Sequence, residues 1–81
     1  MSDFITLLNT LLINTKKAGA TFSNNRQNLT ITIYKENATK KFYNYIFKLL
    51  TLNIYLLKNI IIDNDINNNK EYLIINFEKI N

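Results

Sequence analysis

The chain has 81 residues and a mass of 9.6 kDa, which is enough for one small domain and excludes a multidomain enzyme. It contains no Cys and no His, so disulfides, the usual zinc ligands and imidazole general bases are excluded. We therefore expect no enzymatic activity, no metal site and no cofactor. A core of this size rarely supplies more than ~3–5 kcal/mol of stability, and the composition favours a chain that is stabilised by a partner.

Basic residues are concentrated in the first three quarters of the chain, although the formal net charge is only +4. Residues 1–60 carry eight basic and two acidic side chains, whereas residues 61–81 carry two basic and four acidic ones. A localised basic surface attracts polyanions by counterion release, but an ordinary solvated surface can have the same composition. The charge pattern by itself leaves both interpretations open.

Residue usage is biased towards amino acids with A/T-rich codons, since 15 Asn and 13 Ile stand against one Gly and no Pro. Mutational pressure in an AT-rich genome, such as that of an organelle, accounts for this bias. The Asn excess is therefore not interpreted as a low-complexity segment. Met1, Ser2 and Asp3 place an acid where a secretory or mitochondrial presequence has positive charge, so we expect no import signal. That is consistent with synthesis inside the organelle, or with a bacterial cytoplasm.

The first predicted element is a helix over residues 3–16, where apolar residues recur at helical spacing. Ser2 or Asp3 can cap its amino end, and Lys16 and Lys17 stand favourably at its carboxyl end. Gly19, the single glycine of the chain, lies where the chain must turn out of the helix. Residues 18–28 are mostly small and polar, and we predict a loop or an irregular extended segment there.

A strand over residues 29–34 is predicted from strict alternation of apolar and polar residues. After a turn, Asn37 or Thr39 can cap a second helix that ends at about Thr51. Asn53 follows, at the position where a helix commonly ends with a left-handed backbone conformation. The predicted buried stripe of this helix is Phe42, Tyr43, Ile46, Phe47, Leu49 and Leu50.

Residues 54–62 and 72–77 are apolar, β-prone segments separated by a polar connector over residues 63–69. We predict two strands joined as a hairpin. The expected fold is α+β, with the order α-β-α-β-β in one domain and two helices on one face of a three-stranded sheet. Lys48 and Lys58 interrupt the most apolar stretch, residues 46–62, so no transmembrane helix is expected.

Short motifs at the joints of this order match a known pattern. The first motif is Asp-x-Ile-x-x-(Met/Leu)-x-x-x-Ile-x-Asn. Its positions are occupied here by Asp3, Ile5, Leu8, Leu12 and Asn14. A strand followed by Pro-x-Ser-Lys corresponds to residues 37–40, and a Gly-Phe-Ile step after the helix corresponds to residues 53–55. In these features the chain resembles the amino-terminal domain of the bacterial-type small-subunit ribosomal protein S-eight family.

The resemblance has clear departures. The proline of the family's turn is Asn37, the glycine of its step is Asn53, and the Arg near the end of its first helix is Ile13. Residues 1–81 resemble about half of the family's protein, and the carboxyl-terminal domain that makes the principal grip on small-subunit rRNA has no counterpart. The resemblance implies that a separate chain or neighbouring ribosomal proteins take the place of that domain.

The strongest candidate for an RNA contact is the entrance of the second helix, where Lys35, Asn37, Thr39, Lys40 and Lys41 cluster. Ammonium groups beside helix-terminal N–H groups form a phosphate site; the alternative is a plain solvated cap.

Other candidates are weaker, because each has a structural alternative. Lys16, Lys17 and Arg26 flank a loop that RNA could order or that could stay disordered, and Asn14 matches a family position near rRNA or is an ordinary helix-end residue. Among the tyrosines, Tyr34, Tyr43, Tyr45 and Tyr55 fit core packing better than base stacking. Asp63 and Asp65 lack the Gly and Glu of a calcium loop.

Three functional hypotheses follow. The first is a structural constituent of a mitochondrial, or other organellar, small ribosomal subunit that binds rRNA through phosphate contacts and adjoins other ribosomal proteins. The alternative is a small accessory subunit of a respiratory membrane complex encoded in an AT-rich organelle genome. The third is a small phage or plasmid protein that binds its own partner chain.

Overall fold

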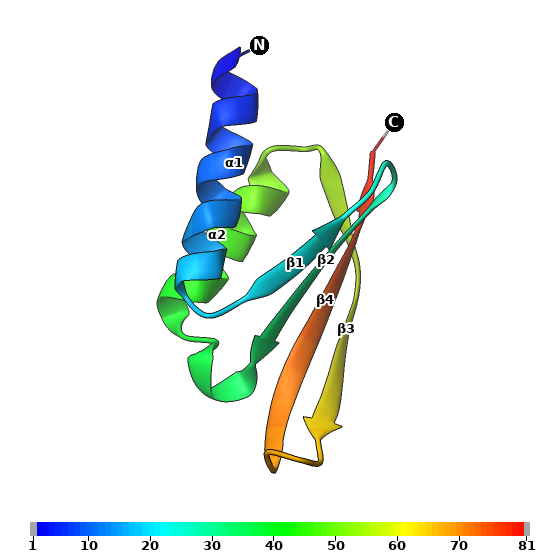
Figure 1. Ribbon diagram of the computed structural model, residues 1–81. Helices are drawn as coiled ribbons and strands as arrows, with labels where there is room; N and C mark the ends of the chain where they lie inside the picture. The colour runs from blue at the N-terminus through cyan, green and yellow to red at the C-terminus, as the bar shows by residue number, and fades with distance from the viewer. Residues whose placement is uncertain (1, 81) are drawn as a thin grey trace.

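The computed structural model describes the backbone of residues 2–80 and the side chains of residues 9–80. The elements in order are α1 (Ser2–Lys17), β1 (Thr21–Asn24), β2 (Asn28–Tyr34), the 3-10 helix η1 (Lys35–Asn37), α2 (Lys40–Thr51), β3 (Tyr55–Asp65) and β4 (Lys70–Lys79). Figure 1 shows α1 and α2 on one face of an antiparallel sheet. The predicted α+β class is confirmed, with both helices on the same face.

The sheet has four strands in the order β1-β2-β4-β3 among the described residues, so the prediction of three strands was wrong by one. The additional strand β1 lies inside the segment 18–28 that was expected to be a loop or an irregular extended segment. Its four residues are all exposed, and it has no hydrophobic alternation from which a strand could be predicted. It forms because Asn25 Oδ1 accepts from the N–H groups of Gln27 and Asn28, which folds Phe22 back opposite Ile31.

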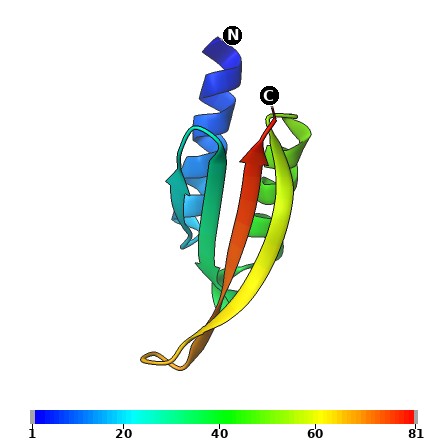
Figure 2. The same cartoon turned by 90° about the vertical axis from the view of Figure 1, so that its right-hand side faces the viewer.

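The hairpin of β3 and β4 is longer than expected. The connector predicted over residues 63–69 shrinks to a turn at residues 66–69, because Asp63 pairs opposite Tyr72 and Asp65 opposite Lys70. Asn69 in the turn has a positive φ of 53°. Figure 2 shows this long hairpin twisting, with its tip bent away from the rest of the sheet.

The turns at the helix ends agree with the sequence-based expectation. Gly19 has φ 99° after α1, and Asn53 has φ 59° after α2, so both occupy conformations that most L-residues avoid. Thr39 is the N-cap of α2, but its side chain makes no capping hydrogen bond. The predicted capping residue is therefore in place without the predicted side-chain contact.

The core lies between the sheet and the two helices. Its most fully buried apolar side chains are Leu29, Ile31, Ile33, Phe42, Leu49, Ile75 and Phe77. The predicted stripe of α2 was too wide, because Tyr43 is 48% and Phe47 is 67% exposed. Only the side of a helix that faces the sheet and its neighbour can be buried in a two-layer fold, and these two rings lie beyond it.

Among residues 2–80 the opposite face of the sheet carries no helix. It bears polar side chains together with the apolar pair Ile61 and Ile74, which lie opposite each other on β3 and β4. Thr30 donates to Asn76 Oδ1 at 2.9 Å, and Asn76 Nδ2 donates to Asn59 Oδ1 at 2.7 Å. This chain of hydrogen bonds crosses β2, β4 and β3. Among the residues described, no helix is both long and apolar enough to cross a membrane.

Candidate nucleic-acid interface

Two pairs of lysines that are far apart in the sequence lie at the same end of the helix pair. α1 and α2 run in opposite directions, so the last residues of α1 lie beside the entrance of α2 (Figure 1). Lys16 and Lys17 occupy the last turn of α1, and Lys40 and Lys41 the first turn of α2. We call these four residues the basic helix end.

Acidic side chains among residues 9–80 do not neutralise the charges of the basic helix end. All four lysines are exposed, and none forms an ion pair with an acidic side chain among residues 9–80. The first turn of α2 contains no acidic residue, although an acid there would be favourable against the helix dipole. The positive end of the α2 dipole therefore coincides with the ammonium groups of Lys40 and Lys41, whereas Lys16 and Lys17 lie at the negative end of the α1 dipole.

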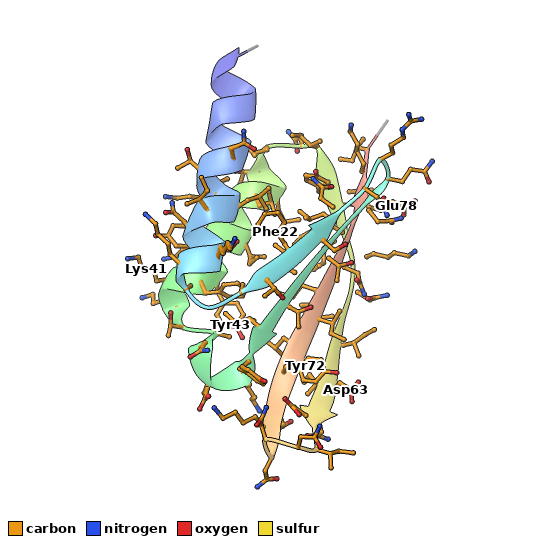
Figure 3. All side chains as sticks on the ribbon, viewed as in Figure 1. Phe22, Lys41, Tyr43, Asp63, Tyr72 and Glu78 are labelled. Atoms are coloured by element: carbon orange, nitrogen blue, oxygen red, sulfur yellow. The ribbon has the colours of Figure 1, made fainter. Side chains whose placement is uncertain are left out.

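The backbone at the entrance of α2 retains donors for an anion. The Thr39 side chain makes no capping bond. The first N–H of α2 that donates to a backbone carbonyl is that of Tyr43, which donates to the Thr39 carbonyl at 3.1 Å. Unsatisfied N–H groups at a helix start are a common phosphate site. Figure 3 shows Lys41 extending away from the sheet.

Asn37 and Lys35 lie next to this end and have structural contacts of their own. Asn37 is half-buried beside Gly19, and its carbonyl accepts from the Thr39 N–H at 2.9 Å. Lys35 Nζ lies 3.8 Å from Glu71 Oε1 with both side chains exposed, and an exposed pair of this kind contributes little.

Two further candidate residues lie in different surroundings. Asn14 is half-buried, and its carbonyl accepts from the Ala18 N–H in the last turn of α1. Arg26 lies in the turn between β1 and β2, where the Lys79 N–H donates to the adjacent Gln27 carbonyl. That turn is at the far end of the molecule from Lys41, near Glu78 (Figure 3). Because residues 18–28 form a hairpin arm, the structure does not bring Arg26 to the basic helix end.

The tyrosines divide between core and surface. Tyr55 is 5% exposed and packs edge-on against Phe77 with ring centroids 6.3 Å apart, so core packing is confirmed for it. Tyr34 and Tyr45 are half-buried. Tyr43 is exposed, and the core interpretation was wrong for this residue.

Sequence reasoning missed a polar cluster on the helix-free face, at the tip of the β3–β4 hairpin. Tyr34 Oη donates to Asp65 Oδ2 at 2.8 Å, and Asn68 Nδ2 donates to the same oxygen at 2.8 Å. Tyr72 Oη donates to Asp63 Oδ2 at 3.2 Å, and Figure 3 shows these two side chains together. The bend of the hairpin encloses an open hollow of about 690 Å³ beside Tyr34 and Tyr72.

Contacts around the tip of the hairpin shift the pKa values of three side chains, those of Asp65, Lys70 and Tyr72. The hydrogen bond from Tyr34, aided by that from Asn68, lowers the pKa of Asp65 below its usual 3.8. The contact with Glu36, at 2.7 Å, raises the pKa of Lys70. Desolvation, followed by the charge of Asp63, raises the pKa of Tyr72. Among the described residues, no group of three or more His, Cys, Asp or Glu side chains could hold a metal ion.

Comparison with known proteins found no matching family model, no matching curated protein and no matching solved structure. The resemblance to the ribosomal family therefore stays a prediction.

Proposed function

We propose that the protein binds RNA through phosphate contacts at the basic helix end, and that it is a non-catalytic structural constituent of an organellar small ribosomal subunit. The observation that carries the proposal is the meeting of Lys16, Lys17, Lys40 and Lys41 at one end of the helix pair without acidic partners among residues 9–80.

Bringing the four lysine ammonium groups together costs electrostatic free energy. Four ammonium groups at the end of two helices repel one another, and those of Lys40 and Lys41 also oppose the dipole of α2. An RNA backbone relieves both effects, because phosphates neutralise the lysines and the condensed counterions of the RNA are released. Phosphate contacts of this kind position a protein on RNA without reading a base sequence.

The ribosomal assignment is supported by the family resemblance and by two local features. The fold keeps the family's order of helix, strand, helix and hairpin, with β1 added after the first helix. The left-handed backbone of Asn53 stands where the family has glycine, and the joint at residues 37–40 leads directly into α2. A structural role also suits a domain with a small core, because docking stabilises a marginal fold.

The experiment compares two double charge reversals that change the net charge equally. Lys40→Glu with Lys41→Glu removes half of the basic helix end, whereas Arg26→Glu with Lys79→Glu acts at the opposite end of the molecule. Binding to a single-stranded RNA is measured over a range of salt concentrations. We expect the first variant to lose affinity and to flatten the slope of log K against log salt by about 1.4, at roughly 0.7 per lost contact. We expect the second to behave like the wild type.

Equal losses in the two variants would show that net charge, and not the basic helix end, determines RNA binding. The ribosomal part of the proposal has its own measurement, which is the sedimentation of the native chain from its source. Co-sedimentation with a small-subunit particle that contains rRNA is expected. Recovery in a particle without RNA, or in detergent-extracted membrane, would overturn it.

A further inference from the structure

The edge strand β3 exposes a long row of apolar side chains. Among residues 2–80 it pairs with β4 on one side only, so the hydrogen-bonding groups along its other edge face solvent. Its exposed apolar residues are Leu56, Leu57, Ile60, Ile61 and Ile62, each between 43% and 60% exposed. An apolar free edge of this length is a site for strand addition.

The apolar row continues onto one flank of α2. Tyr45 and Leu52 are packed against the core on one flank of α2. Because successive residues of a helix are about 100° apart, Tyr43 and Phe47 lie on the opposite flank. Figure 2 shows α1 behind the β1 side of the sheet and α2 behind the β3 side. The exposed flank of α2 is therefore the one turned towards the free edge of β3.

We propose that the free edge of β3 pairs with β3 of a second copy of this chain, in antiparallel orientation about a two-fold axis perpendicular to the sheet. Such an axis is the symmetry of a closed dimer with one self-complementary surface. It places the helices of both copies on the same face of a continuous sheet. The exposed flanks of the two α2 helices, with Tyr43 and Phe47, then approach each other above the junction.

The sequence of β3 selects the register. Lys58 is the extra residue of a bulge, since the pairing with β4 shifts between Leu57 and Asn59, and a bulge interrupts a regular ladder. With Ile61 on the axis, Ile61 faces itself and Ile60 faces Ile62 of the other copy. Centring the pair on Ile60 or Ile62 instead sets isoleucines opposite Asn59 or Asp63, so the Ile61 register buries the most apolar surface.

Charge complementarity favours a second copy in the antiparallel direction. β3 carries Lys58 near its start and Asp63 and Asp65 at its end. In the Ile61 register Lys58 lies opposite Asn64 of the other copy, within reach of the two neighbouring carboxylates. A parallel pair would set Lys58 beside Lys58 and the carboxylates beside each other. The charges along β3 are therefore complementary to those of a second β3 that runs in the opposite direction.

Sedimentation of the purified full chain at several concentrations tests the proposal. One strand pair and two helix flanks form a small interface, so we expect a monomer–dimer equilibrium with a dissociation constant of about 1–100 μM. Ile61→Lys sets two ammonium groups against each other on the axis and is expected to weaken the dimer at least about tenfold. Ile13→Lys is the matched control, because Ile13 lies on α1, on the β1 side of the sheet, and is 53% exposed. It is expected to leave the dimer unchanged.

The register is tested by exchanging charges. Lys58→Glu and Asp63→Lys should each weaken the dimer, and the double variant should restore it. A chain that stays monomeric up to ~1 mM, equal effects of Ile61→Lys and Ile13→Lys, or a double variant no better than the single ones would each overturn the proposal. A monomeric chain that binds another protein's strand at this edge would also overturn it. Because β3 and the basic helix end are separate, loss of RNA binding does not bear on this result.

Discussion

A Cβ atom on Gly19 would lie 3.1 Å from the side-chain Nδ2 of Asn37. The turn that leaves α1 and the 3-10 helix that precedes α2 therefore meet in close contact, although they are separated by two strands in the sequence. This close approach lies at the same end of the helix pair as the basic helix end.

Substitution of Gly19 is expected to destabilise the protein through backbone conformation and through crowding. Its φ of 99° is unfavourable for alanine, and we expect Gly19→Ala to lower the free energy of unfolding by about 1–3 kcal/mol. Adding Asn37→Ala removes the crowding but not the strain, so it should recover only part of the loss. Urea unfolding measures both, and a Gly19→Ala variant as stable as the wild type would contradict the strained turn.

Asn53 ends α2 in a left-handed conformation with φ 59°. Glycine adopts this conformation more readily, so Asn53→Gly should raise the free energy of unfolding by about 0.5 kcal/mol, while Asn53→Ala should lower it by about 1 kcal/mol. Asn67→Ala is the control, because Asn67 is an exposed turn residue without a positive φ. Similar losses in the two alanine variants would show that the left-handed backbone is not the cause.

Phe42 and Phe47 provide a matched pair on one helix. Phe42 is fully buried and Phe47 is 67% exposed. Phe42→Leu should lower the free energy of unfolding by about 1–2 kcal/mol because it leaves unfilled core volume, whereas Phe47→Leu should change it by less than about 0.5 kcal/mol. Chemical unfolding at concentrations where the chain is monomeric checks this. Comparable losses would mean that Phe47 is buried in solution.

The hydrogen bond from Tyr34 to Asp65 makes stability depend on pH. It lowers the folded-state pKa of Asp65 below 3.8, so its contribution is present above pH 3.8 and is lost as the pH falls through the folded value. The difference in unfolding free energy between the wild type and Tyr34→Phe should therefore be constant near neutral pH and shrink in acid. Tyr43→Phe, on an exposed ring, should show no such change. A Tyr34→Phe difference that is independent of pH would exclude the ionised carboxylate as the acceptor.

The geometry of the candidate site could be predicted in part. The local charge at residues 16–17 and 40–41 is visible in the sequence, and so is its position at two helix ends. Bringing the two pairs together required the antiparallel packing of α1 and α2. The position of Arg26 could not be predicted from the sequence. It lies in the turn of the β1–β2 hairpin, away from the basic helix end, and β1 has no hydrophobic pattern from which that hairpin could be predicted.

The sequence by itself determined the elements whose signal is local. Helical spacing defined α1 and α2, alternation defined β2 and β4, and Gly19 and Asn53 marked turns, because each depends on the conformational preferences of neighbouring residues. The tertiary structure alone decided which strand is an edge, so the apolar run at residues 60–62, typical of a buried strand, lies exposed on β3. It also decided that Tyr43 and Phe47 are uncovered and that Tyr34 meets Asp65. Burial and long-range contacts depend on the order in which strands pair, and no short segment of the chain encodes that order.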